Sequence, residues 1–205
     1  MNSKLHWLAI PLLALAAASC DKEDAPATTE WQDRNYAFLD SLAAAYDTQQ
    51  ADPSSIAEDD TIYKLTPQHL SNYTIYYKKL GVKDGFIGIG ETAKFTDVAR
   101  VYYQGRLIDG TMFDSNFSDD YPDYELDIPS DFLVSGLQAS QSGIIQGWTE
   151  ILQVMRPAAN KTDRKGDFFR VYIRPELAYG AEGSGSIQGY STLIFDINLL
   201  EVNPE

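Results

Sequence analysis

Cysteine and histidine are almost missing from this sequence. Its 205 residues include one cysteine, Cys20, and two histidines. A lone cysteine cannot form a disulfide within the chain, and so few thiol and imidazole groups exclude zinc sites built from Cys and His. They also exclude cysteine–histidine catalysis, and a Ser-His-Asp triad would have to use His69, the only histidine after the first twenty residues.

Positive charge is also scarce. The chain has 16 Lys and Arg against 30 Asp and Glu, which gives a formal net charge of −14. Such a surface repels phosphate backbones, so nucleic acid is excluded as a natural partner, whereas basic or extended polypeptides remain suitable. With 44% hydrophobic residues, the chain can still bury a core.

Long apolar runs are limited to one, at residues 5–18, which follows Lys4. It is shorter than the roughly 20 residues that a membrane-spanning helix needs, and it suits a secretory signal. The Ala-Ala-Ser-Cys sequence at 17–20 resembles the signal of bacterial lipoproteins. We therefore predict a signal peptide over 1–19, a lipid anchor at Cys20 and a location in the bacterial cell envelope, on the outer membrane. An ordinary secretory signal is the alternative.

The segment after the signal has the composition of a tether, predicted over 20–30. Its acidic cluster at 22–24 fits either a cell-surface export tag or a solvated tether. A helical extension and linker is predicted over 31–72. Within it, apolar residues at helical spacing predict an amphipathic helix over about 31–47, which packs on the main domain or on a second copy in a homodimer. Thr66-Pro67 predicts a short helical turn over 67–72.

From residue 72 onward the pattern is mainly that of strands. Residues 72–80, 98–110, 168–173 and 191–202 are rich in β-branched and aromatic side chains. One amphipathic helix is expected at 147–155. Antiparallel strands with a single helix predict an α+β domain in which the sheet wraps around that helix.

Four segments in order then resemble the FKBP-type peptidyl-prolyl cis/trans isomerases. They are VYYQGRLIDGTMFDSN at 101–116, GIIQGWTEILQVM at 143–155, FRVYIRPELAYG at 169–180 and STLIFDINLLEV at 191–202. The resemblance implies an FKBP-like fold over 73–203 and isomerisation of Xaa-Pro bonds in exported proteins, without a cofactor or metal. The clients would be proline-containing polypeptides.

The resemblance also implies a site, in which Trp148 forms the floor and the Ile145 N–H and Tyr179 hydroxyl hold substrate carbonyls. The catalytic set would be Tyr103, Phe113, Asp114, Ile145, Trp148 and Tyr179. Substrate binding would involve Ile144, Ile187, Phe195 and Tyr124. Tyr124 is assigned to the side wall although the spacing of the sequence there differs from the family pattern. Taken singly, most of these side chains would be ordinary core residues, and Asp114 would be a turn cap.

Three regions differ from the family pattern. The loop at 187–190 reads Ile-Gln-Gly-Tyr where a proline is usual, and 156–164 resembles an insertion. The acidic stretch at 118–127 would be a rim for basic clients, a calcium site or a solvated loop. The altered loop supports an alternative function, a client-binding chaperone or assembly module without turnover; reuse of the fold as a surface scaffold is a third.

Overall fold

The computed structural model describes residues 25–53, 56–57, 60–119, 121–136, 144–160, 162 and 164–205. The predicted signal peptide and Cys20 lie outside them. The helices are α1 (Ala25–Ala51), α2 (Gln146–Leu152) and the short 3-10 helices η3 (Val82–Asp84) and η4 (Pro175–Leu177). The strands are β1 (Ile62–Leu65), β2 (Ile75–Lys79), β3 (Val98–Arg106), β4 (Met112–Ser115), β5 (Ser130–Leu133), β6 (Phe168–Ile173) and β7 (Leu193–Val202).

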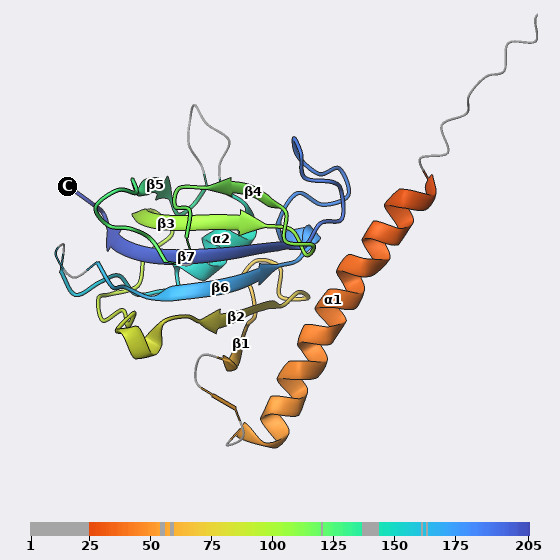
Figure 1. Ribbon diagram of the computed structural model, residues 1–205, viewed down its shortest axis with the longest axis horizontal. Helices are drawn as coiled ribbons and strands as arrows, with labels where there is room; N and C mark the ends of the chain where they lie inside the picture. Colours follow the sequence, from red (N-terminus) through yellow and green to blue (C-terminus); the bar gives the residue numbers. More distant parts are fainter. Residues whose placement is uncertain are drawn as a thin grey trace, which may run out of the picture.

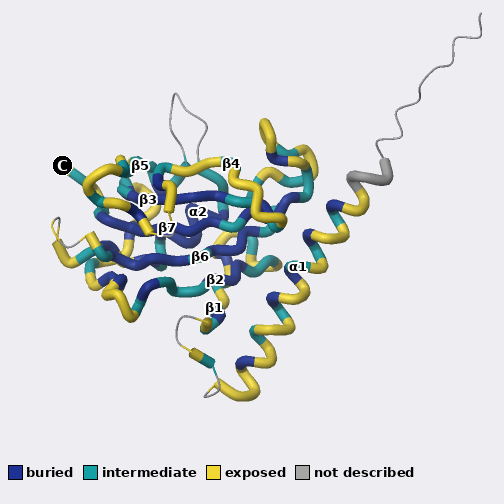
Figure 2. Tube along the Cα trace, viewed as in Figure 1, coloured by how far each residue is buried: buried dark blue, intermediate teal, exposed yellow. Residues whose placement is uncertain are grey.

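These strands form one antiparallel sheet in the order β1-β2-β6-β7-β3-β4, with β5 paired to the other half of β3 (Figure 1). The pairing of β7 with both β3 and β6 places the longest strands at the centre, where Figure 2 shows the chain most deeply buried. The predicted α+β architecture is confirmed: a single antiparallel sheet curves around α2. The strands expected at 168–173 and 191–202 are β6 and β7.

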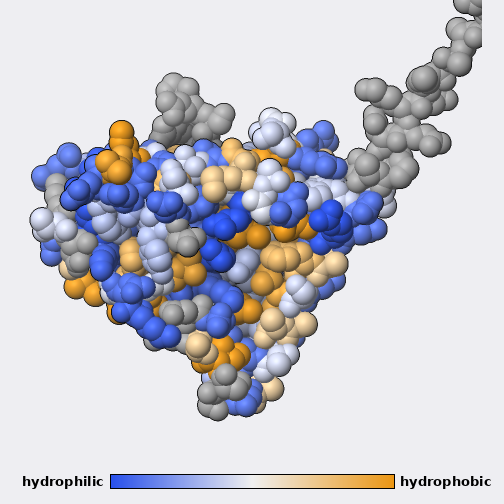
Figure 3. Space-filling view, viewed as in Figure 1, coloured by the Kyte–Doolittle hydropathy of each residue, from blue (hydrophilic) through white to orange (hydrophobic). Residues whose placement is uncertain are grey.

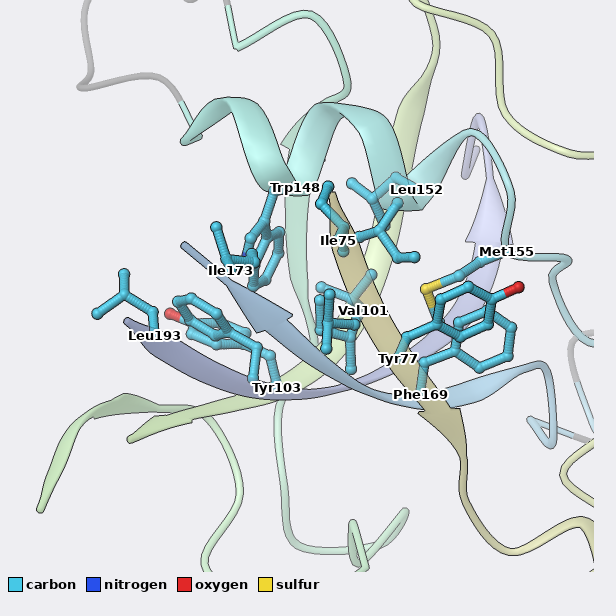
Figure 4. Packing of buried hydrophobic residues seen from close by; sticks show 14 of the residues in the cluster. Ile75, Tyr77, Val101, Tyr103, Trp148, Leu152, Met155, Phe169, Ile173 and Leu193 are labelled. Atoms are coloured by element: carbon cyan, nitrogen blue, oxygen red, sulfur yellow. The ribbon is translucent and has the colours of Figure 1, made fainter. Parts of the chain in front are cut away.

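The main core lies between the sheet and α2. Figure 4 shows Trp148 and Leu152 pointing from α2 toward side chains of the sheet, among them Val101 and Tyr103. Gly147 permits this close packing, because a Cβ atom there would lie 2.4 Å from Ile173 Cγ2. The first turn of α2 is therefore held tightly against the centre of the sheet.

Helix α1 is longer than the predicted 31–47 and lies along one side of the domain (Figure 1). Leu39 and Leu42 pack with Ile62, Tyr76 and Tyr172 from three strands. In Figure 3, apolar side chains gather along the strip where this helix meets the domain. The apolar stripe is thus buried on the helix's own domain, which is one of the two arrangements that the sequence left open.

The second half of α1 is fastened to the edge of the sheet by Gln49, which is 6% exposed. Its Nε2 donates to the carbonyl of Ile62 at 2.9 Å, and its Oε1 accepts from the Ile62 N–H at 2.7 Å. β1, which the sequence pattern did not predict, is thereby held between the helix and β2. Within the described residues, no helix is both long and apolar enough to cross a membrane.

The helical turn predicted over 67–72 is wrong. The chain there has bends and a turn without a helix, and the Gln68 N–H donates to the buried Glu150 carboxylate at 2.9 Å. A tertiary partner from α2 has replaced the local hydrogen bond that Thr66 and Pro67 would have started.

Candidate active site

A small pocket opens between the start of α2 and the sheet, with a volume of about 160 Å³. We call it the aromatic pocket; its lining consists of Tyr103, Asp114, Phe132, Ile144, Ile145, Trp148, Tyr179 and Phe195. Four strands (β3, β4, β5 and β7), α2 with the two residues before it, and the loop between β6 and β7 therefore contribute to a single cavity. Apart from Asp114, its side chains are aromatic or aliphatic.

Trp148 is the centre of this arrangement. Its side chain is 3% exposed, and its ring centroid lies 5.2 Å from each of those of Tyr103, Phe132 and Phe195. All three contacts are edge-to-face, at interplanar angles of 86°, 72° and 85°. Edge-to-face packing adds stability beyond the burial of apolar area, so the tryptophan is held rigidly as the floor of the pocket.

Phe113 and Gly105 form a second layer behind Phe195. The Phe113 and Phe195 rings are in edge-to-face contact at 5.4 Å, although Phe113 does not line the pocket itself. A Cβ atom at Gly105 would lie 2.6 Å from both rings. The glycine of the 101–116 segment thus leaves room for the two phenylalanines to pack.

The polar side of the pocket is a Tyr103–Asp114 pair. The Tyr103 hydroxyl donates to Asp114 Oδ2 at 2.9 Å, and Asp114 remains exposed to solvent. Burial of Tyr103, its hydrogen bond to Asp114 and the charge of that carboxylate raise the pKa of Tyr103 well above 10. The tyrosine therefore stays protonated at neutral pH and continues to donate to Asp114.

Two further groups can act as donors to a bound molecule. Burial, with a contribution from the Asp114 charge, raises the pKa of Tyr179, whose side chain is 40% exposed at the pocket mouth. Ile145 precedes α2, and its carbonyl accepts from the N–H groups of Trp148 and Thr149. Within the described part of the chain, no acceptor is found for the Ile145 N–H.

Besides Phe113, two predicted site residues lie outside the lining of the pocket. Tyr124 lies on the opposite face of the sheet, where its ring packs on Tyr102 at 5.5 Å and its hydroxyl donates to Asn198 Oδ1 at 3.2 Å. Consecutive strand residues face opposite sides, so a contact with Tyr102 excludes Tyr124 from the side that carries Tyr103. Ile187 is 9% exposed and belongs to the main core, without lining the pocket.

Phe132 takes the side-wall position that was assigned to Tyr124. Its ring lies 5.6 Å from Tyr103 and 5.2 Å from Trp148. The sequence signal for it is short: Phe132 lies in β5 and Val134 directly follows this strand, and residues two apart share one face of an extended chain. A strand of four residues is a weaker sequence signal than the acidic, tyrosine-rich segment that contains Tyr124.

The loop between β6 and β7, residues 174–192, carries Tyr179; we call it the pocket loop. Helix α1 holds both of its ends. Near its beginning, the Tyr36 hydroxyl donates to Glu176 Oε1 at 3.0 Å. Near its end, Trp31 Nε1 donates to Ser191 Oγ at 3.0 Å and the Thr192 N–H donates to Asn35 Oδ1 at 2.7 Å.

The Asn35–Thr192 contact is shielded from water, and the two groups of the Tyr36–Glu176 contact have shifted pKa values. Asn35 and Thr192 are fully buried. Burial and the hydrogen bond to Glu176 raise the pKa of Tyr36 to about 12. Burial raises the pKa of Glu176, but hydrogen bonds, chiefly from Arg174, outweigh this effect and lower it overall. At neutral pH the pair is therefore a neutral phenol donating to a carboxylate.

Two carboxylates of the acidic stretch at 118–127 accept hydrogen bonds from backbone N–H groups of the same stretch. Asp123 Oδ1 accepts from the Glu125 N–H at 2.9 Å, and Asp127 Oδ2 accepts from the Asp123 N–H at 2.7 Å. Among the residues that the structure describes, no group of three or more acidic, His or Cys side chains could hold a metal ion. These contacts favour the solvated-loop interpretation of this stretch.

Similarity to known proteins identifies the class of protein to which this chain belongs. Residues 90–200 match the family model described as "FKBP-type peptidyl-prolyl cis-trans isomerase". The match covers more than half of the chain, so this chain belongs to the FKBP-type peptidyl-prolyl cis-trans isomerase family.

Curated relatives carry the same description. The chain is 38% identical over 120 residues to a probable FKBP-type peptidyl-prolyl cis-trans isomerase of Haemophilus influenzae, covering 58% of this chain and 40% of the relative. It is 35% identical over 138 residues to the FKBP-type isomerase FkpA of Escherichia coli, covering 63% and 43%. The chain thus spans about two fifths of the length of these relatives.

Two solved structures are similar as well. One is a peptidyl-prolyl cis-trans isomerase from Pseudomonas syringae, with 25% identity, a TM-score of 0.49 and coverage of 80% of this chain and 96% of that one. The other is FkpA from Escherichia coli, with 25% identity, a TM-score of 0.49 and coverage of 91% and 75%.

Proposed function

We propose that this protein catalyses the cis/trans isomerisation of Xaa-Pro bonds in polypeptides, within the aromatic pocket. The observation that carries the proposal is the rigid floor: Trp148 with three rings in edge-to-face contact, under a cavity of about 160 Å³. A small, preformed apolar cavity of this kind fits a prolyl ring. The family match over residues 90–200 supports the same activity.

The chemistry requires no nucleophile, general base or metal. The barrier to rotation, about 18–20 kcal/mol, comes from amide resonance. At the twisted transition state this resonance is lost, so the carbonyl carries less charge separation and loses less by leaving water. An apolar pocket therefore favours the twisted bond over the planar one, and each ~1.4 kcal/mol of this preference raises the rate about tenfold.

The polar groups would orient the substrate. The Ile145 N–H and the Tyr179 hydroxyl are the donors we assign to client carbonyls on either side of the twisting bond. Asp114 would accept the hydrogen bond from the Tyr103 hydroxyl, so that the ring of Tyr103 forms a wall of the pocket. Hydrogen bonds that hold the flanking carbonyls while the bond rotates would bind the twisted transition state more tightly than the planar substrate.

A client-binding module without turnover is the alternative, motivated by the altered sequence at 187–190. Two observations favour catalysis. The pocket loop is fastened to α1 near both ends, and within the loop the Tyr190 N–H donates to the Gly180 carbonyl at 2.8 Å. A loop that is fixed in this way can hold Tyr179 in place without the proline that the family usually has.

A protease-coupled assay on short Xaa-Pro peptides distinguishes the two functions. The proposal predicts a rate of cis-to-trans conversion that rises in proportion to protein concentration. A folded protein that binds these peptides without accelerating conversion, for several residues before proline, would establish the binding module instead.

We further propose that the mature protein is lipid-anchored through Cys20 in the bacterial cell envelope, on the outer membrane. The support is the 5–18 apolar run followed by Ala-Ala-Ser-Cys. Expressed in a bacterium that processes lipoproteins, the parent is expected in the membrane fraction and Cys20→Ala in the soluble envelope fraction. Equal fractionation of both proteins would contradict the anchor.

A homodimer through α1 would have to use the face of the helix that its own domain leaves exposed.

A further inference from the structure

A second hollow adjoins the aromatic pocket. Its volume is about 350 Å³, and it lies between α2, the 68–69 segment and Phe95. Ile144 lines both cavities, so the two adjoin at this residue. A polypeptide that places its proline in the aromatic pocket can therefore place a neighbouring side chain in this hollow. We call it the acidic hollow, after the carboxylate described next.

The carboxylate is that of Glu150, in the second turn of α2. Glu150 is 4% exposed and lines the hollow. Its Oε2 accepts the Gln68 N–H at 2.9 Å, and no Lys or Arg is paired with it in the described part of the chain. A buried carboxylate is costly unless it is neutralised, so this group favours a cation brought by a ligand.

The rest of the hollow suits a long cationic side chain. Its two apolar lining residues are Phe95, which is 43% exposed, and Ile144, which is partly exposed. Besides Glu150, the other lining residues are polar: Gln68, His69, Ser135, Gln146, Thr149 and Gln153. Lys and Arg have an apolar stem, which can pack on Phe95 and Ile144, and a charged tip, which can pair with the Glu150 carboxylate. The formal net charge of −14 also attracts basic segments from a distance.

We propose that the acidic hollow is a specificity subsite for a lysine or arginine side chain, within three residues of the proline in the client. The inference rests on the proposed isomerase function and adds a preference to it. An extended chain advances about 3.3 Å per residue, so neighbouring cavities correspond to positions close together in the client sequence.

The test uses the protease-coupled assay with peptides of one length and a fixed proline. Lysine, norleucine or glutamate is placed in turn at each of three positions on either side. Because His69, which has a titratable side chain, also lines the hollow, all measurements are made at one pH, pH 8. At one position we expect kcat/KM for the lysine peptide to exceed that for norleucine by about tenfold, with glutamate lowest.

Glu150→Gln should remove this preference. The amide keeps an oxygen that can accept the Gln68 N–H, so the fold is retained while the charge is lost. The norleucine peptide should be turned over at the parent rate, and the lysine peptide should fall to the same level. Gln153→Lys, which adds a competing ammonium group to the lining of the hollow, should cause the same loss and provides an independent second variant.

Glu182→Gln is the matched control, because Glu182 is exposed on the pocket loop and does not line the hollow. It should leave the lysine preference unchanged. An equal loss in Glu150→Gln and Glu182→Gln would mean general electrostatic attraction, and a preference that survives Glu150→Gln would equally overturn the subsite. A protein that turns over none of the peptides would refute the isomerase function itself.

Discussion

Replacing Trp148 by leucine should lower kcat/KM for Xaa-Pro peptides by at least about tenfold, which corresponds to about 1.4 kcal/mol of transition-state stabilisation. The indole is the only group that contacts Tyr103, Phe132 and Phe195 together in the ring contacts of the described chain. Leucine fills less of the floor, and the three rings would lose the surface that fixes their spacing. The pocket would then hold the planar and twisted prolyl bonds almost equally.

Two matched tyrosine variants separate the pocket from general loss of structure. Tyr103→Phe keeps the ring and removes the hydroxyl that donates to Asp114, so a loss of a few fold is expected. Tyr102→Phe changes the adjacent residue on the opposite face, where the hydroxyl donates to the Asp127 carbonyl at 3.2 Å, and should leave the rate unchanged. Circular dichroism confirms the fold of each variant. A folded Trp148→Leu with parental kcat/KM would move the active site elsewhere.

Replacing Asn35 by alanine should destabilise the protein by about 2 kcal/mol, because the Thr192 N–H would be left buried without its acceptor. The Asn35 Nδ2 donor to the Trp31 carbonyl, at 2.8 Å, is lost at the same time. In a chain of this size, that change lowers the melting temperature by roughly 4–8 °C. Because the same contact holds the end of the pocket loop, kcat/KM should also fall several fold at temperatures where the variant is fully folded.

Ser41→Ala is the control on the same helix. Ser41 is exposed, and its hydroxyl donates to the Phe38 carbonyl within α1. Its removal should change the free energy of unfolding by less than about 0.5 kcal/mol, as surface substitutions usually do, and leave the rate unaltered. If Asn35→Ala melts like the parent and retains its rate, α1 does not support the pocket loop.

The parts of the fold that were predictable from sequence have strong local signals. β6 and β7 are long, apolar, β-branched and aromatic runs, and α2 has a clear apolar face beside Trp148. These signals work because burial on a sheet or against a helix demands a fixed period of apolar residues. Trp148 lies in α2, Phe195 in β7 and Tyr103 in β3, which falls within the strand run expected at 98–110. The structure brings the rings of these three residues into contact.

The parts that could not be predicted depend on contacts between distant residues. Whether Phe132 or Tyr124 forms the side wall of the pocket depends on which face of the sheet the chain covers between β4 and β5. The turn expected at Thr66-Pro67 is absent because the chain there hydrogen-bonds to Glu150, 82 residues away from Gln68. The Asn35–Thr192 contact spans 157 residues. Contacts between residues so far apart in the sequence cannot be predicted from a local pattern of hydrophobicity.

The most direct test of the central claim measures the rotation itself, without a protease. Uncatalysed prolyl isomerisation takes tens to hundreds of seconds, which is too slow to produce exchange peaks between cis and trans signals in two-dimensional NMR exchange spectra. With a small amount of this protein added to an excess of an Xaa-Pro peptide, we expect exchange peaks to appear, and to vanish or weaken sharply with Trp148→Leu. A peptide whose resonances shift on binding while its cis and trans signals remain unexchanged would contradict the isomerase account.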